Sequence, residues 1–136
     1  MTLVDSNILL DIFTRTPNWW EWALVQLEDA ALHGPLLIND VIYAETSVRF
    51  QSIDEFDAAL EVAGITVASM PRKALFLAGK AFARYRAAGG TRTGVLPDFF
   101  IGSHAELESL PLLTRDAQRY RHYFPSVILI APESEE

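Results

Sequence analysis

The chain has 136 residues, half of them hydrophobic, and no cysteine, which allows one domain with a buried core and excludes disulfides and thiolate zinc sites. No apolar stretch approaches the roughly 20 residues of a membrane helix and no secretory signal opens the chain, so we expect a single cytoplasmic domain over residues 1–136 without membrane contact. The net charge of −7 excludes a uniformly basic nucleic-acid-binding surface.

The first eleven residues predict a buried strand that runs into a helix. Leu3 and Val4 form a short apolar run that stops at Asp5, and a helical apolar period follows, with Ser6 or Asn7 as the expected cap. Ligands bind at the carboxyl ends of strands in open α/β sheets. Asp5 is therefore expected at the rim of a cleft, although a purely capping role for it is the alternative.

The rest of the chain alternates predicted helices and strands. Further helices are expected over residues 17–33, 41–50, 53–63, 71–88, 98–108 and 117–123. Ser52 and Glu55 form a capping box for the one at 53–63. Further strands are expected over residues 36–38, 65–70, 112–113 and 127–130. This alternation, with runs of Leu, Ile and Val, predicts an α/β fold in which helices cover both faces of a parallel sheet.

Four acidic residues stand at comparable places in this pattern. Two follow strands, one begins a helix after the loop 91–96, and one lies about a turn and a half into a partly apolar helix: Asp5, Asp116, Asp98 and Glu45. Converging carboxylates repel by about 4 kcal/mol per pair at ~4 Å and an effective dielectric of about 20. The set therefore indicates hard divalent cations, and oxygen ligands favour Mg²⁺ or Mn²⁺. The alternative is four unrelated caps and surface acids.

Four blocks of the chain resemble the acidic blocks of PIN-domain ribonucleases, in the length and order of the VapC toxins of toxin–antitoxin pairs. The blocks are Val4-Asp5-Ser6-Asn7, Glu45 in its helix, Leu96-Pro97-Asp98-Phe99-Phe100-Ile101-Gly102 and Leu113-Thr114-Arg115-Asp116. The resemblance spans nearly the whole chain. It implies a three-layer α/β/α PIN-like fold with about five parallel strands, and a Mg²⁺- or Mn²⁺-dependent endoribonuclease.

The resemblance also assigns roles to residues. Metal binding and catalysis would fall to Asp5, Glu45, Asp98 and Asp116, with Asn7 and Thr114 as polar support. One departure is Asn39-Asp40, which stands where the family often has Ser or Thr followed by Pro. The implied reaction is metal-assisted hydrolysis with one ion or two.

The mechanism requires no histidine base. His104 lies about 240° around its predicted helix from Asp98, and we assign no catalytic role to it, His33 or His122. Basic residues concentrate in the second half: residues 1–64 hold eleven acidic and two basic side chains, and residues 65–136 hold seven and nine. Candidate contacts to RNA phosphates are Arg86, Arg92 and Arg115. Solvated surface arginines are the alternative for each.

A partner surface is indicated by Trp19, Trp20 and Trp22. On a helix, positions 19 and 22 share a face while position 20 lies about 100° away, so one core face does not easily hide all three. Partly exposed aromatic residues mark interfaces, and a wide core-facing stripe is the alternative. The resemblance implies an antitoxin segment along this region, an antitoxin arginine in the acidic cleft, and a homodimer.

Other protein classes fit the sequence less well. A receiver domain needs paired acids after the first strand and a late lysine, but no lysine follows Lys80. An aspartate-nucleophile phosphatase needs a second Asp two residues after the first, and position 7 is Asn. A catalytically silent protein-binding module and a nuclease of RNA processing outside a toxin–antitoxin pair stay as alternatives.

Overall fold

Strand β1 (Thr2–Val4) lies at the centre of a parallel sheet, which the computed structural model describes as five-stranded over residues 1–94 and 96–132. Its order is β3 (Ile65–Ala68), β2 (Leu36–Asn39), β1, β4 (Leu112–Leu113) and β5 (Leu129–Ile130). The chain proceeds from β1 to β2 and β3, and then returns to β4 on the other side of β1. Ligand crevices form where the strand order reverses in this way, here between the carboxyl ends of β1 and β4.

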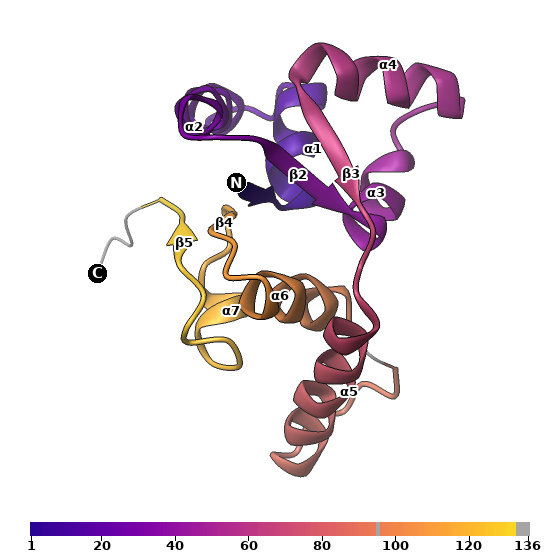
Figure 1. Cartoon of the computed structure of the whole chain (residues 1–136), viewed down its shortest axis with the longest axis vertical. Helices are drawn as coiled ribbons and strands as arrows, with labels where there is room; N and C mark the ends of the chain where they lie inside the picture. Colours follow the sequence, from indigo (N-terminus) through magenta and orange to yellow (C-terminus); the bar gives the residue numbers. More distant parts are fainter. Residues whose placement is uncertain (95, 133–136) are drawn as a thin grey trace.

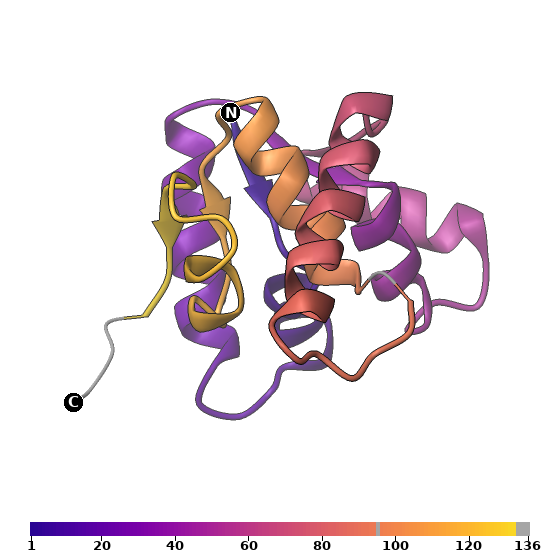
Figure 2. The same cartoon turned by 90° about the horizontal axis from the view of Figure 1, so that it is seen from below.

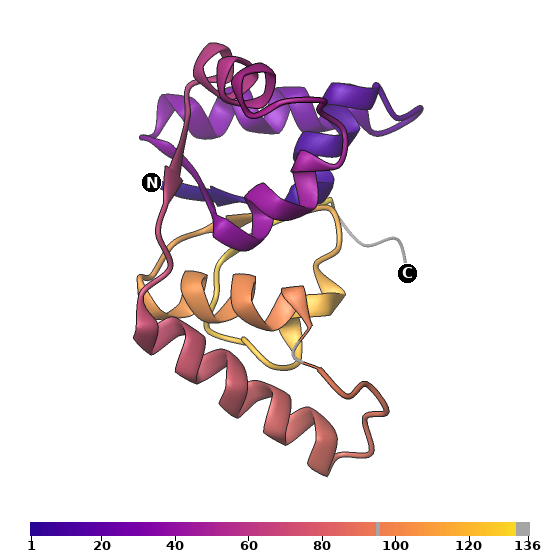
Figure 3. The ribbon, with the colours of Figure 1, turned by 90° about the vertical axis from the view of Figure 1, so that its right-hand side faces the viewer.

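Helices cover both faces of the sheet, which confirms the three-layer α/β/α prediction (Figures 1 and 3). One face carries α1 (Ser6–Thr14), α2 (Trp20–Leu32) and α4 (Ile53–Ala63), and the other carries α5 (Arg72–Ala87), α6 (Pro97–Leu107) and α7 (Gln118–Arg121). Helix α3 (Asp40–Ser47) contacts α1 in one layer and α6 in the other. The loop that follows α5 lies at the end of the molecule toward which β1 points (Figure 2). The crevice is thus bordered by elements of both layers.

The starts of the first two helices differ from prediction. Asp5, and neither Ser6 nor Asn7, is the N-cap of α1, because its carboxylate accepts a hydrogen bond from the backbone N–H of Ser6. Helix α2 begins at Trp20 instead of residue 17. Asn18 has a φ of 71°, and this left-handed conformation interrupts a right-handed helix.

The remaining differences concern element ends. Helix α3 stops at Ser47, β3 stops at Ala68, α7 spans only Gln118–Arg121, and β5 begins at Leu129. The hydroxyl of Ser52 caps α4 by accepting from the N–H of Glu55, as predicted. The carboxylate of Glu55, however, accepts from the N–H of Gln51 at 3.3 Å, one residue before the cap.

The core is formed by the inner strands and the helices against them. Leu3, Val4, Ile38, Leu112 and Leu113 are completely buried, as a parallel sheet covered on both faces requires. Rigid packing here fixes the backbone at the ends of β1 and β4, where the polar residues begin. Among residues 1–94 and 96–132, no helix is long and apolar enough to cross a membrane.

Candidate active site

Asp5 is the buried centre of a hydrogen-bond network at the end of β1. Its Oδ1 accepts from the backbone N–H of Ser6 at 2.7 Å, and its Oδ2 accepts from the hydroxyls of Thr114 at 2.9 Å and Tyr120 at 2.7 Å. Burial raises the pKa of Asp5, and the hydrogen bonds from Tyr120, Thr114 and Ser6 oppose that rise. These donors hold the carboxylate in one orientation, because they come from three different segments.

Asn7 and Thr114 connect Asp5 to Asp116. The amide of Asn7 donates to Thr114 Oγ1 at 3.2 Å and to Asp116 Oδ2 at 3.5 Å, while its own oxygen accepts from the N–H of Arg115 at 3.1 Å. The hydroxyl of Thr114 also accepts from the N–H of Asp116 at 3.1 Å. Both residues predicted as polar support therefore contact the predicted acids directly, across the point where the strand order reverses.

Glu45 and Asp98 approach the same place from α3 and α6. The hydroxyl of Ser6 donates to Glu45 Oε1 at 3.0 Å, which links the helix of Glu45 to the end of β1. Burial raises the pKa of Glu45; the bond from Ser6 opposes the rise, and the charges of Asp5 and Asp98 add to it. Burial likewise raises the pKa of Asp98, against the effect of Arg119 and with that of Asp5 and Asp116. Asp98 thus lies within electrostatic range of the other three acids.

Arg119 stands between two of these acids. Its Nη1 lies 3.7 Å from Asp98 Oδ1, and its Nε lies 3.7 Å from Asp116 Oδ2. The arginine side chain is 56% exposed, so it can leave this position without opening the core. One guanidinium balances only part of the charge of four carboxylates.

The residues fit a hard divalent cation by their chemistry. The donors are carboxylate oxygens, which suit Mg²⁺ and Mn²⁺. A cation would favour the ionised form of Asp5, Glu45 and Asp98, which burial opposes. As the side chains stand, no three acids or histidines among the described residues are grouped closely enough to hold an ion. Binding would therefore require Asp98 and Asp116 to exchange Arg119 for the cation.

The histidines lie elsewhere. His104 is buried, with Nδ1 3.1 Å from the Asn39 amide and Nε2 3.4 Å from Glu108 Oε1. His33 Nδ1 lies 2.9 Å from the carbonyl of Asp29 at the end of α2. The ring of His122 packs edge-on against Tyr123. These surroundings support the expectation that the four acids carry the chemistry without a histidine base.

The three candidate RNA-contacting arginines separate into two groups. Arg86 donates to the carbonyl of Arg92 at 2.8 Å, and both are exposed near the end of α5. The side chain of Arg115 lies elsewhere, with its Nε 3.4 Å from Asp11 Oδ2 and its guanidinium 5.0 Å from the centre of the Trp19 ring. Arg115 also lines a hollow together with Asp116, one of the proposed metal ligands.

The tryptophans are all partly exposed, and each has different neighbours. Trp19 precedes α2 yet still meets Trp22 edge-to-face at 6.2 Å. The guanidinium of Arg15 lies 5.3 Å from the centre of the Trp20 ring. Trp22 packs against the core. Trp19 thus lies against Arg115 and lines a hollow with Asp116, while Trp20 lies in a separate region beside Arg15.

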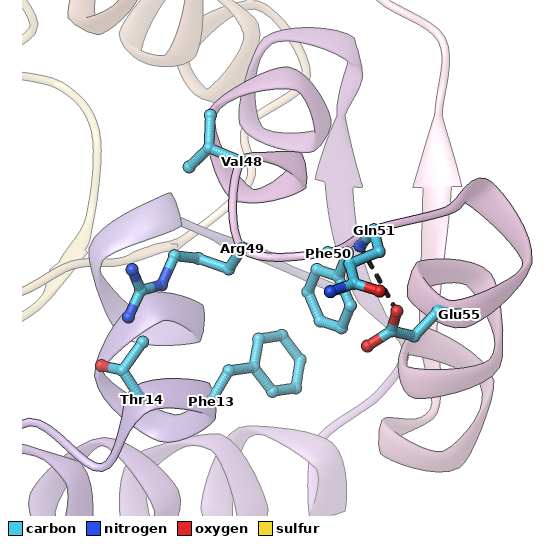
Figure 4. A pocket seen from close by; sticks show the side chains of 7 residues that line it. All are labelled: Phe13, Thr14, Val48, Arg49, Phe50, Gln51 and Glu55. Atoms are coloured by element: carbon cyan, nitrogen blue, oxygen red, sulfur yellow. Dashed lines mark hydrogen bonds between the residues drawn. The ribbon is translucent and has the colours of Figure 1, made fainter.

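A hollow of about 560 Å³ lies away from the four acids, at the ends of α1 and α3 and the start of α4 (Figure 4). Phe13 and Phe50 meet edge-to-face within it, and Arg49 and Glu55 supply charges at its border. Val48, which also lines the hollow, is 76% exposed. This hollow contains none of the four acids.

Four residues of the site were missed as functional candidates by sequence reasoning: Ser6, Asp11, Arg119 and Tyr120. Ser6 was considered only as a cap. Arg119 and Tyr120 lie three and four residues after Asp116, a spacing that places side chains on one helix face. That spacing was the available signal for both. Nothing local distinguishes Asp11, whose importance comes from its burial beside Arg115.

Comparison with known proteins gives one family. A family model described as PIN domain matches residues 2–125, whereas no curated protein matches in sequence. One similar solved structure is VapBC2 from Rickettsia felis bound to a DNA fragment from the promoter of these proteins. A chain of that complex has a TM-score of 0.72 at 18% identity, covering 97% of this chain and 98% of that one.

Two further solved structures are similar in fold. A chain of VapBC-1 from nontypeable Haemophilus influenzae has a TM-score of 0.68 at 15% identity, covering 96% of each chain. A chain of a toxin–antitoxin complex from Klebsiella pneumoniae has a TM-score of 0.64 at 20% identity, covering 94% of this chain and 96% of that one. At such identities the likeness concerns the fold.

Proposed function

The chain belongs to the PIN-domain family, and from this premise we propose that it is a Mg²⁺- or Mn²⁺-dependent endoribonuclease that hydrolyses phosphodiester bonds of RNA. The observation that supports the proposal best is that short contacts link all four acids at the reversal of strand order: Ser6 joins Asp5 to Glu45, Asn7 joins Asp5 to Asp116, and Arg119 joins Asp116 to Asp98. These acids come from four separate segments. Helix caps that were unrelated to one another would have no reason to meet there.

The proposed roles follow from the contacts. A bound divalent cation would lower the pKa of an attacking water and offset charge on the scissile phosphate. Asp98, Asp116 and Glu45 would hold the cation together with Asp5, whose orientation Thr114 and Tyr120 maintain. Asn7 keeps the segment after β4 in register with α1. When Arg119 leaves Asp98 and Asp116, its charge becomes available to the phosphate.

We further propose that the chain is the toxin of a toxin–antitoxin pair, inhibited by its cognate antitoxin. The fold neighbours from Rickettsia, Haemophilus and Klebsiella support this, since each comes from a VapBC or toxin–antitoxin complex. The partly exposed Trp20 and Trp22 offer a contact surface for that partner. An arginine of the antitoxin could replace Arg119 among the acids.

A homodimer is also proposed. Leu75 and Phe76 are adjacent on α5, and they are 42% and 65% exposed. Helix α5 forms the outer edge of its layer (Figure 3), so this apolar pair is accessible to a second copy. Sedimentation of the purified chain would measure the association directly.

Cleavage of defined nucleic acids tests the proposed activity. The purified chain is incubated with structured and single-stranded RNAs, and with DNA of the same sequence, in EDTA, Mg²⁺ or Mn²⁺. We expect metal-dependent cutting of RNA, loss of cutting in Asp98→Asn, and wild-type cutting in Asp54→Asn, which alters an exposed acid in the first turn of α4. Equal activity of Asp98→Asn and wild type would contradict the proposal, and an inactive but antitoxin-binding chain would favour the silent module.

A further inference from the structure

A hollow of about 440 Å³ borders the acidic site; we name it the Trp19 hollow. Its lining includes Trp19, Arg115, Asp116, Arg119 and Arg121. Asp116 and Arg119 are shared with the acidic site, where Arg119 also contacts Asp98. A molecule in the Trp19 hollow would therefore be continuous with one bound at the acids.

The charge of the Trp19 hollow is opposite to that of the chain. Three arginines and one acid line it, although the whole chain carries a net charge of −7. Arg121 is exposed on α7 and is available to an incoming ligand. A local basic surface in an acidic protein favours an anion, and arginine suits phosphate oxygens in particular.

Trp19 and Arg115 form one wall of the hollow, and the buried Asp11 holds Arg115 in position. The guanidinium of Arg115 lies 5.0 Å from the centre of the Trp19 ring, and its Nε lies 3.4 Å from Asp11 Oδ2. Asp11 is 3% exposed, and this Oδ2 has no hydrogen-bond partner in the described structure. The buried carboxylate therefore has Arg115 as its counter-ion, and it holds the arginine against the ring. The result is a stacked pair, with the guanidinium of Arg115 over the Trp19 ring, that is held in place without a ligand.

A planar surface next to phosphate-binding arginines matches one class of ligand. Nucleobases stack on aromatic side chains and on arginine planes, and single-stranded RNA presents unpaired bases. The volume falls within the roughly 300–1,000 Å³ of small-molecule sites. An acidic peptide would use the charge of the arginines but would leave the outer face of the Trp19–Arg115 stack without a planar group against it.

We propose that the Trp19 hollow is a nucleotide subsite, which binds the base and phosphate of the RNA nucleotide adjacent to the scissile bond. The base stacks on the guanidinium plane of Arg115, which Trp19 supports from the other side, and Arg121 contacts the phosphate. Arg119 lies at the boundary with the acids. This assignment rests on the proposed ribonuclease function, and it moves Trp19 from the predicted partner surface to the substrate path.

Nucleotide binding is measured first without cleavage. The full chain, ¹⁵N-labelled and kept in EDTA, is titrated with adenosine, cytidine, guanosine and uridine 5′-monophosphates while the tryptophan indole signals are followed by NMR. The Trp19→Phe variant identifies the Trp19 signal. We expect at least one monophosphate to shift the Trp19 signal while the Trp20 and Trp22 signals stay unchanged. Ribose 5-phosphate, which lacks a base, should shift it less.

Kinetics on RNA provide the second measurement. We expect Trp19→Leu and Arg121→Gln to raise KM by about tenfold, as for loss of one stacked base or phosphate contact, with kcat changed far less. Trp19→Phe should recover most of the loss because it restores an aromatic face. The matched controls are Trp20→Leu and Arg84→Gln, an exposed arginine of α5, and both should keep the wild-type KM. Circular dichroism verifies that each variant is folded.

The outcomes separate this subsite from the nuclease proposal. Wild-type KM in folded Trp19→Leu and Arg121→Gln, with a Trp19 signal that no monophosphate moves, overturns the subsite while RNA cleavage stands. A shifted Trp19 signal in a chain that cuts no RNA supports nucleotide binding and overturns the nuclease. If an acidic peptide shifts the Trp19 signal and the monophosphates do not, the hollow is a protein-binding site and the nucleotide assignment is wrong.

Discussion

The hydroxyl of Tyr120 donates a 2.7 Å hydrogen bond to Oδ2 of Asp5, a residue 115 positions earlier in the chain. Both side chains are buried. Burial and the nearby acids raise the pKa of Tyr120 far above its ordinary value, so the phenol stays protonated and can serve only as a donor to the carboxylate. Asp5 is thereby held by the last helix of the described chain, which links the candidate active site to the folding of the carboxyl-terminal segment.

Replacing Tyr120 by Phe should destabilise the fold by about 2 kcal/mol, the range for a buried hydrogen bond to a charged group. The matched control is Tyr43→Phe, because Tyr43 donates to Asp57 at 2.9 Å on the exposed surface, where the loss should stay below about 0.5 kcal/mol. Urea unfolding of both variants measures the difference. Equal losses of unfolding free energy in the two variants would show that the Tyr120–Asp5 hydrogen bond stabilises the fold no more than the exposed Tyr43–Asp57 bond does.

The stability of the metal-free chain should depend on pH through Asp98. Burial raises the pKa of Asp98 in the folded state, so the folded chain binds this proton more tightly than the unfolded chain does. The resulting stabilisation is complete below the unfolded pKa of about 4, and it disappears as the pH rises through the folded value. In EDTA, the Tm of wild type should therefore fall relative to the Tm of Asp98→Asn as the pH is raised from 4 to 7. A constant difference between the two proteins across that range would contradict the sign.

Magnesium should stabilise the folded chain. Binding to the folded state alone adds about 2.7 kcal/mol when free metal is ~100 times Kd, which is a rise of several degrees in Tm for a domain of this size. Asp98→Asn should melt higher than wild type in EDTA and gain less from Mg²⁺. Calorimetry at matched ionic strength separates binding from screening. An unchanged wild-type Tm at Mg²⁺ concentrations that support RNA cleavage would contradict binding of the cation by these carboxylates in the folded chain.

Removing the charge of Arg119 should strengthen metal binding. Its guanidinium lies 3.7 Å from both Asp98 and Asp116, so a cation that binds these acids must displace it. Arg119→Gln should lower the Kd for Mg²⁺ about threefold to tenfold, corresponding to the loss of a partly exposed ion pair of about 1 kcal/mol. Calorimetric titration without RNA measures this, with Arg84→Gln as the control. Weaker Mg²⁺ binding would mean that Arg119 supports the metal site instead of competing for it.

Trp20 provides the test of the partner surface. The ring is partly exposed beside Arg15, and we expect Trp20→Ala to cost about 2 kcal/mol or more in binding to the cognate antitoxin, with little loss of fold stability. Binding is measured by calorimetry and stability by urea unfolding. A destabilisation of roughly 3–5 kcal/mol, typical of a buried aromatic residue, would place Trp20 in the core and would remove it from the interface.

Much of the fold was predictable because its signals are local. The apolar run Leu3-Val4, broken by Asp5, indicates both a buried strand and its end, since neighbouring residues alone set that pattern. Parallel pairing of such strands follows from the helices between them. With the strand ends at one edge, Asp5 and Asp116 were expected near each other before any coordinates, and Asn7 and Thr114 do join them. The start of α2 was mispredicted. Pro17 fits a first helical position, and the left-handed backbone of Asn18 is not visible in the pattern of apolar residues.

The contacts that distinguish this site depend on tertiary structure. Tyr120 reaches Asp5, and Arg119 reaches Asp98, only because β4 pairs beside β1 and α7 packs against α6. Asp11, Arg115 and Trp19 come together for the same reason, and no spacing in the chain links them. Local patterns specify periods and caps, which involve residues a few positions apart. Pairing between segments a hundred residues apart is decided by how the two helical layers close over the sheet, and that is where this chain assembles its acids, their arginine and the adjoining hollow.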